Sequence, residues 1–393
     1  MSIKEKAKKY FDETVALRRG FHMYPDMYPA LNEGITRTTK IVMEELEKYG
    51  VPYEILPDYS ILATIDSGKP GKTILLRADM DALPIQEECN EEYCSKIDGV
   101  AHLCGHDCHT ASLITATRIL NEEKDKLQGK VKCIFQSCEE DGNGAIDIVL
   151  YEGVMDDVNA VFGVHTYTEL EAGTVSVQAG PRMAASMRCF IEFQGKAGHG
   201  SSPHLCIDPV VAASSFIMNL QSIVSREMNT FDSVAITVGT IHGGSICTAV
   251  ADKVNLGLTI KFLNPDIGDH IKESITRIAM TTAETFRAKC ELYFDMFFRP
   301  VVNDSELAAI AEKSAETLIG KENIIECTPW TASEDYSEYT KYVPGIFAFI
   351  GVRNESKGII NAAHHPKFMV DEKSLEIASG LYAQFAFDYL TKE

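Results

Sequence analysis

The sequence has no long hydrophobic run and comparatively few positive charges. No segment approaches the roughly 18 consecutive apolar residues of a membrane-spanning helix, and the start of the chain lacks the apolar core and cleavage site of a signal peptide. Lys and Arg number 37 against 57 Asp and Glu, which gives a formal net charge of −20. We therefore expect neither nucleic acid nor an anionic membrane as a partner.

Low-complexity tracts and internal repeats are also missing. Hydrophobic residues make up 45% of the chain and charged residues 24%, which is typical of a soluble globular protein and argues against a disordered or fibrous one. A length of 393 residues predicts two or three domains, at roughly 150 residues each.

The eleven cysteines do not form a recognisable disulfide framework. Their number is odd, and they are scattered over a long chain rather than concentrated in a small one. The simplest interpretation is a protein of the reducing cytoplasm, in which a functional cysteine would be a thiolate or a metal ligand.

Short apolar runs alternate with helical stretches, which predicts an α/β architecture. In the first half we expect a helix over residues 111–120 and strands over residues 61–65, 73–78, 131–136 and 160–164. Polar residues follow three of these strands. Because ligands bind outside the carboxyl ends of strands in such sheets, we expect these residues to meet.

The pattern changes near residue 180. From there we predict, in order, strand 188–194, helix 208–224, strands 233–241 and 253–263, helix 267–287 and strand 290–298. This βαββαβ order is the ferredoxin-like plan. We therefore predict a catalytic domain with a mixed central sheet, residues 1–182 and 296–393, interrupted by a lid domain, residues 183–295.

The densest chemical signal is the run HLCGHDCH, residues 102–109. Cys104 and His106 are side chains that zinc prefers, and the glycine between them allows both to turn toward one point. Asp107 could orient an imidazole from behind. The alternative is a polar loop that opens the next helix.

The pair Glu139-Glu140 follows the strand predicted at 131–136. Neighbouring side chains on an extended segment point in opposite directions. One glutamate could therefore bind a metal while the other faces a substrate as a base, although an isolated acidic run is more often a surface turn.

His165 and His364 each follow or end an apolar run, and either one alone is more often structural than functional. Together with Cys104, His106 and Glu140, however, they exceed the four ligands of a closed tetrahedral site. Such an excess favours two metal ions and an activated water.

Two further positions are weaker candidates. Asp81 follows the second strand, where it could bond a ligand histidine or belong to an ordinary turn before a proline. His199 lies in a glycine-rich segment of the predicted lid and could donate a hydrogen bond to an oxyanion.

Taken together, these motifs resemble the metal-dependent aminoacylase and carboxypeptidase superfamily. The similarity is greatest to its amidohydrolase branch, which includes hippurate hydrolase, N-acyl-amino-acid amidohydrolases and indoleacetyl-amino-acid hydrolases. It covers nearly the whole chain and runs through residues 21–22, 77–84, 102–109, 139–140, 165, 180–185, 195–204, 333–335 and 364–366.

The resemblance implies a binuclear site and a lid that commonly serves for dimerisation. Glu139 would be the general base, Asp81 a supporting residue, and His199 the lid histidine that approaches the substrate. The implied metal ligands are Cys104, His106, Glu140, His165 and His364. His364 is preferred over His365 because the family places the ligand two residues before the proline.

The resemblance leaves the metal and the substrate open. Zinc, manganese, cobalt and nickel all suit the ligand set. Two lid positions depart from the family: Thr248 stands where relatives often have Asn, and Lys261 where many have Arg. A lysine cannot reproduce the bidentate grip of an arginine on a carboxylate.

The resulting hypothesis is a metal-dependent hydrolase of N-acyl amino acids or related small amides, which acts as a homodimer. Three alternatives remain open: a dipeptidase or carboxypeptidase, a metal-independent hydrolase with Cys104 as nucleophile, and a non-catalytic binding protein on the same fold.

Overall fold

A computed structural model describes residues 1–27, 35–142 and 144–391, which form two compact units. The first comprises Met1–Gly180, Val302–Thr328 and Asp335–Glu393, and the second Pro181–Val301 and Pro329–Glu334. The segment Pro329–Glu334 lies outside the predicted lid. It belongs to the second unit because the Trp330 N–H donates to the Arg182 carbonyl, and the Ala184 N–H donates to the Trp330 carbonyl.

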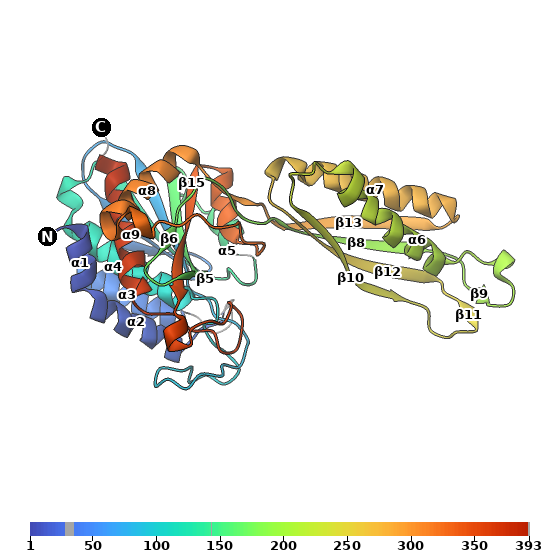
Figure 1. Cartoon of the computed structure of the whole chain (residues 1–393), viewed down its shortest axis with the longest axis horizontal. Coiled ribbons are helices and arrows are strands. Elements are labelled where there is room, and N and C mark those ends of the chain that lie inside the picture. The colour runs from blue at the N-terminus through green and yellow to red at the C-terminus, as the bar shows by residue number, and fades with distance from the viewer. Residues whose placement is uncertain (28–34, 143, 392–393) are drawn as a thin grey trace. The chain divides into compact units, whose positions relative to one another are not determined.

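The first unit is built on a seven-stranded mixed sheet (Figure 1). Its central strands β4, β3, β5 and β15 are mutually parallel, whereas β1, β2 and β6 are antiparallel to their neighbours. In spatial order the strands are β1 (Tyr53–Ile55), β2 (Ile61–Asp66), β4 (Lys130–Gln136), β3 (Thr73–Asp79), β5 (Ala160–Glu171), β15 (Gly345–Arg353) and β6 (Val175–Ser176).

The helices of this unit cover both faces of the central sheet. For this reason the central strands are continuous apolar runs in the sequence. Every residue of β3 is buried, as expected for a parallel strand that is covered on both faces. Phe162 of β5 stacks on Phe385 at 4.3 Å between ring centroids. The helices are α1 (Ile3–Lys9), α2 (Phe11–Met23), α3 (Arg37–Tyr49), α4 (His106–Glu122), α5 (Gly144–Ile148), α8 (Ser305–Ile319) and α9 (Ser374–Thr391).

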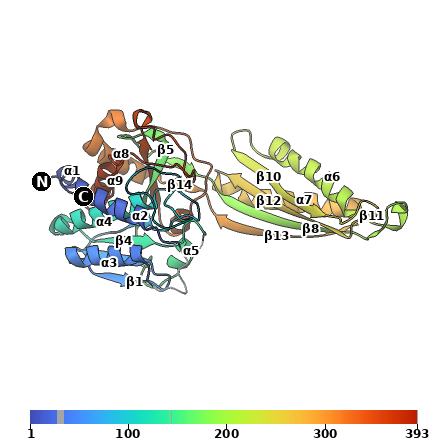
Figure 2. The same ribbon diagram turned by 90° about the horizontal axis from the view of Figure 1, so that it is seen from below.

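The second unit is a four-stranded antiparallel sheet in the order β10-β12-β8-β13, with two helices along it (Figures 1 and 2). Burial alternates along β8 and β12, so one face of each strand packs against the helices. The elements are β8 (Ser186–Gln194), α6 (Pro209–Ser222), β10 (Val234–Gly243), β12 (Lys253–Phe262), α7 (Gly268–Thr285) and β13 (Lys289–Phe298).

Both units confirm the predicted fold class. The second follows the ferredoxin-like order, and its strands and helices begin and end within a few residues of the predicted ones. Four short strands complete the structure: β7 (Gly180–Met183), β9 (Gly198–His199), β11 (Ala249–Val250) and β14 (Val301–Asn303).

One disulfide departs from the expectation for the cysteines. Cys89 and Cys94 are bonded to each other across a separation of only five residues. The spacing of the cysteines did not predict this pair, because the bridge closes one short loop and is not part of a set of disulfides with a recognisable spacing. The remaining nine cysteines are free.

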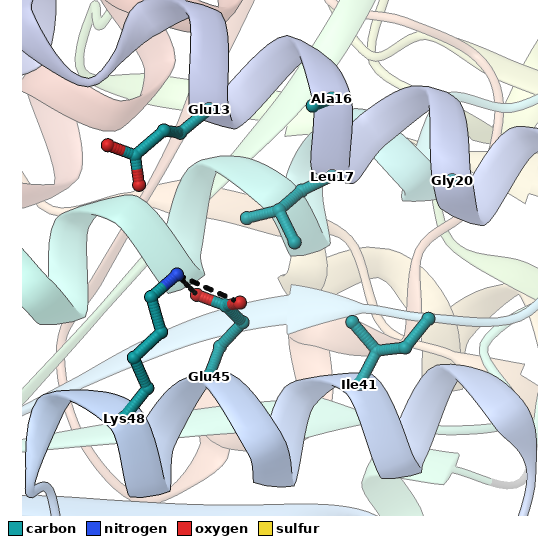
Figure 3. A pocket seen from close by; sticks show the side chains of 7 residues that line it. All are labelled: Glu13, Ala16, Leu17, Gly20, Ile41, Glu45 and Lys48. Carbon is teal, nitrogen blue, oxygen red and sulfur yellow. Dashed lines mark hydrogen bonds and ion pairs between the residues drawn. The ribbon is translucent and has the colours of Figure 1, made fainter.

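A pocket of about 350 Å³ lies between α2 and α3 in the first unit. Leu17 and Ile41 face it from opposite helices, and Lys48 pairs with Glu45 at its rim (Figure 3). Its lining contains none of the predicted site residues. Among the described helices, none combines the length and apolar character needed to cross a bilayer.

Candidate metal centre

The predicted ligands of the first unit gather where β3 and β4 end and α4 begins, beside the middle of β5. His165 does not end its strand as the sequence predicted, because β5 continues to Glu171 in pairing with β15. Their ligand atoms form overlapping groups in which all atoms lie within 4.8 Å of one another. These groups are Cys104–His106–His165, Cys104–Glu140–His364 and His106–Glu139–Glu140. The sequence prediction that separate strand ends would bring these side chains together therefore agrees with the geometry.

Gly105 makes the sharp turn between Cys104 and the helix. Its φ is +97°, and a Cβ there would lie 2.3 Å from the Thr166 hydroxyl, so only glycine fits. His106 is consequently the first residue of α4. Its Nδ1 donates to the Asp81 carbonyl at 2.9 Å, so Nε2 is the ring nitrogen that faces the cluster.

His165 is oriented in the same way. Its Nδ1 donates to the Thr166 carbonyl at 2.7 Å, and its Nε2 lies 3.6 Å from the Cys104 sulfur. Burial, together with the neighbouring His109, lowers the pKa of His165 well below its ordinary value. A neutral imidazole with its Nε2 lone pair directed at a thiol is the form in which histidine binds metals.

The two glutamates do not point in opposite directions as an extended segment would place them. Cys138 has a φ of +60°, which ends the strand geometry immediately before them. Glu139 Oε2 and Glu140 Oε1 each lie 3.9 Å from His106 Nε2. The turn is held by the Glu140 N–H, which donates to Asp81 Oδ2 at 2.9 Å. Asp81 thus contacts both His106 and the glutamate segment.

His364 completes the cluster from the loop after β15. Its φ is +66°, and its N–H donates to the Leu103 carbonyl at 2.7 Å, one residue before Cys104. Its Nε2 lies 3.4 Å from Glu140 Oε1. Interactions with Cys104 and Glu140 raise the pKa of His364 to about 10. By contrast, His365 Nδ1 accepts the Lys367 N–H.

Asp79 and His109 are buried members of the cluster that sequence reasoning missed as a pair. His109 Nδ1 lies 2.6 Å from Asp79 Oδ1, and His109 Nε2 accepts the Thr166 N–H at 2.9 Å. Nδ1 must therefore carry the proton. Asp79 also accepts from Arg77 Nη1 at 2.7 Å and lies 3.7 Å from His106 Nε2. The available signal was the position of His109 one helical turn after His106.

The donor set fits divalent metal ions. Thiol sulfur, imidazole nitrogen and carboxylate oxygen are the three ligand types that zinc takes in proteins. His106 Nε2 and Glu140 Oε1 are buried and have no hydrogen-bond partner among the described residues. Buried polar atoms are nearly always satisfied, so two such atoms that face one point indicate a missing electrophile.

The other predicted residues lie elsewhere. His199 is exposed on β9 of the second unit, where its Nδ1 accepts the Ser201 N–H at 3.1 Å. Lys261, in the same unit, donates to the Ser333 hydroxyl at 2.6 Å, and burial lowers its pKa. Asp107 orients no cluster histidine: it accepts instead from Arg18 at 2.7 Å and contacts His22 at 2.8 Å.

A buried Cys, His and Glu cluster at the carboxyl edge of an α/β sheet is typical of metal-dependent hydrolases. Comparison with known proteins agrees. The description "Peptidase family M20/M25/M40" matches residues 75–388. The chain belongs to this family, and it is a hydrolase.

Several named relatives cover almost the whole chain. It is 36% identical to "IAA-amino acid hydrolase ILR1-like 4" of Arabidopsis thaliana, over 98% of this chain and 87% of the relative. It is 34% identical to "Thermostable carboxypeptidase 1" of Saccharolobus solfataricus, over 99% and 98%. It is also 34% identical to "N-acetyl-L-cysteine deacetylase" of Bacillus subtilis, over 93% and 86%.

Solved structures give the same result. A protein from methicillin resistant Staphylococcus aureus aligns with a TM-score of 0.93 at 33% identity, over 99% of both chains. The Bacillus subtilis YXEP protein, described as a dinuclear metal binding peptidase from the M20 family, aligns with a TM-score of 0.86 at 29% identity, over 98% of this chain and all of that one.

Replacing His109 by alanine should destabilise the protein. The change leaves the buried Asp79 carboxylate and the Thr166 N–H without their partner, which costs about 2–4 kcal/mol of unfolding free energy. Urea denaturation of the metal-free protein measures this loss. His270→Ala, at an exposed position on α7, is the matched control and should change little. A loss below about 1 kcal/mol for His109→Ala would contradict the buried-pair interpretation.

Proposed function

We propose that the protein hydrolyses the amide bond of N-acyl amino acids or related small amides, and that two divalent metal ions bound by Cys104, His106, Glu140, His165 and His364 assist it. The observation that carries this proposal is the pair of unpartnered buried atoms, His106 Nε2 and Glu140 Oε1, inside a thiol–imidazole–carboxylate cluster. Membership of the M20/M25/M40 family and the names of the relatives support it.

When bound, divalent ions supply Lewis acidity, which polarises a carbonyl and lowers the pKa of a coordinated water. The ligand set suits zinc best because of the thiol, and manganese, cobalt and nickel are also compatible with it. The protein fixes the protonation states that such binding needs, since the Asp81 and Thr166 carbonyls hold the Nδ1 protons of His106 and His165.

Glu139 is the proposed general base. Its carboxylate lies at the cluster, 3.9 Å from His106 Nε2, while Glu140 reaches both His106 and His364 and is thereby assigned to metal binding. Glu139 would take a proton from the attacking water and deliver it to the departing amine nitrogen. The amide C–N bond breaks as the new C–O bond forms, and the products are a carboxylic acid and an amine.

His199 is the proposed oxyanion donor. Because its Nδ1 accepts the Ser201 N–H, the neutral ring carries its proton on Nε2. That N–H could donate to the negative oxygen that develops on the acyl carbon. Asp81 would act through His106 and Glu140, both of which it contacts, and is therefore a positioning residue.

Of the three alternatives, one has specific support. A dipeptidase or carboxypeptidase activity is favoured by the relative named as a carboxypeptidase. A thiol route through Cys104 is disfavoured because burial raises the pKa of Cys104, whereas a cysteine nucleophile needs a lowered one. A non-catalytic binding role is disfavoured because Glu139 and all five proposed ligands are present.

Substitution of Glu139 by glutamine should separate catalysis from metal binding. The amide cannot accept the proton from water, so we expect turnover to fall by about 10²–10⁴-fold, with metal content unchanged. Steady-state kinetics and elemental analysis measure the two effects. Glu152→Gln, an exposed glutamate of the same unit, is the control. If the Glu139→Gln variant turned substrate over as fast as the wild type, Glu139 would not be the general base.

A chelator followed by metal add-back should abolish and then restore activity. The assay panel is N-acyl amino acids, benzoylglycine and short dipeptides, each tested with zinc, manganese, cobalt and nickel and followed by release of the free amine. We expect cleavage of the N-acyl substrates by the reloaded protein only. Full activity without metal would favour the Cys104 route, and cleavage of dipeptides alone would indicate a peptidase.

We also propose a homodimer that forms through the second unit. Strand β10 lies at an edge of the four-stranded sheet, and its residues are exposed from Thr240 onward. Antiparallel pairing of this edge with its copy would be self-complementary and would bury its unpaired backbone groups.

We propose the reducing cytoplasm as the location of the protein, because nine cysteines lie outside the disulfide and one of them, Cys247, is exposed.

Ile241→Lys should convert the dimer to a monomer. Ile241 is 49% exposed on β10, and a lysine at an edge strand opposes pairing with a second edge. Sedimentation equilibrium of the wild type should give twice the 43.4 kDa chain mass, and that of the variant the chain mass itself. Leu150→Lys, exposed on the first unit, should remain dimeric. A wild-type protein that is monomeric at micromolar concentration would contradict the proposed homodimer.

A further inference from the structure

The Cys89–Cys94 disulfide closes a loop of the first unit that lies outside the metal cluster. Glu87 precedes this loop and Ser95 follows it, and the Ser95 N–H donates to Glu87 Oε2 at 2.7 Å. Both cysteines are half-buried. The disulfide therefore closes the loop between Cys89 and Cys94, and the hydrogen bond from Ser95 to the Glu87 carboxylate joins the two ends of the chain that flank this loop.

Glu87 connects this loop to the helix that carries His106. Its Oε1 lies 2.8 Å from His22 Nε2, and His22 Nδ1 lies 2.8 Å from Asp107 Oδ2, with all three side chains buried. His22 thus connects the Glu87 carboxylate to the Asp107 carboxylate through its two ring nitrogens. Asp107 directly follows His106, so the disulfide loop is linked to the first turn of α4.

The same loop also supports the segment that carries His364. The Glu88 N–H donates to the Pro366 carbonyl at 2.8 Å, and Lys367 Nζ lies 3.6 Å from Glu88 Oε2. Pro366 is two residues after His364. One short loop thus bonds to two segments that carry proposed ligands, on different sides of the cluster.

A cavity of about 570 Å³ borders the loop at Glu91 and Tyr93. Arg19, Lys357 and Glu372 also line it, so both charge signs face the space. A lining of this kind suits a small polar or zwitterionic molecule next to the loop that the disulfide closes.

We propose that Cys89–Cys94 is an exchangeable disulfide that braces the metal centre, and that a low-molecular-weight thiol opens it and loosens the segments of His106 and His364. The ligand role of those two residues rests on the proposed function. In the first step a small thiolate attacks one cysteine sulfur, the S–S bond breaks, and the other cysteine leaves as a thiolate and takes up a proton.

A second small thiol then attacks the mixed disulfide. It releases the remaining cysteine as a thiol and forms the disulfide of the small molecule, so two thiols supply the two electrons and two protons that Cys89 and Cys94 gain. No other oxidant or reductant is needed.

Hydrogen exchange of the metal-free, full-length chain tests directly whether the disulfide restrains the segments of His106 and His364. The oxidised protein is compared with protein that has been reduced by dithiothreitol and desalted, and with Cys89→Ser/Cys94→Ser. We expect amides of residues 86–96, 106–110 and 364–368 to exchange about tenfold faster after reduction, because contacts that hold these segments are lost. The double variant should match the reduced protein without any reductant.

Cys247→Ser is the matched control, since Cys247 is an exposed free cysteine and its removal should leave the response to dithiothreitol intact. Faster exchange confined to residues 89–94 would overturn the proposal. So would mass spectrometry of the alkylated, air-oxidised protein if it found Cys89 and Cys94 as free thiols.

Zinc affinity gives a second readout. Competition with a chromogenic chelator, after the reductant has been removed, should show about tenfold weaker binding by the reduced protein and by the double variant, in the range expected when partners of a ligand are disturbed. Equal zinc affinity in both forms would contradict the brace. If neither form bound zinc, manganese, cobalt or nickel, the proposed function would fail, and the exchange comparison would still decide the role of the disulfide.

Discussion

The buried carboxylate of Asp79 is the point on which the arrangement of the site depends. It terminates β3, accepts from Arg77 and pairs with His109, which in turn holds the backbone of Thr166 in β5. A buried charge in this position is tolerated because Arg77 and His109 both donate to it. The same bonds hold the middle of β5, next to His165, against the first turn of α4.

Arg77 extends this network to the rest of the unit. Its guanidinium donates to Gln136 at the end of β4 and to Asp335, and Asp335 also accepts the Ala145 N–H of α5. The carboxyl ends of the central strands are therefore tied together by buried polar bonds rather than by apolar packing alone. Such networks specify one arrangement, because any shifted register would leave charges unpaired. The exposed lid residue His199 has no comparable support within its own unit.

The sequence was informative wherever a short apolar run ended in a polar residue. That rule placed Asp81 and Glu140 at one edge of the sheet, whereas Cys104 and His106 were found from the run of residues 102–109. His165 was also selected by this rule, although β5 continues past it to Glu171. The order of the apolar and helical stretches predicted the βαββαβ plan. The sequence could not predict that Glu139 and Glu140 share one direction, because this depends on the positive φ of Cys138. The pairing of Asp79 with His109 and the short disulfide were likewise invisible, since both depend on how the backbone turns in three dimensions.

The charge of the cluster explains why it needs cations. Glu140 is faced by imidazoles at His106 and His364, and Cys104 lies against the same two rings. Without metal, these rings supply the positive charge, and the pKa values of His364 and His106 are accordingly raised. A protonated imidazole cannot bind a metal, so each ion that enters must displace these protons. The direction of both shifts shows that the carboxylates and the thiol favour positive charge at this point. Divalent ions would supply it while binding sulfur, nitrogen and oxygen together, which protons cannot do.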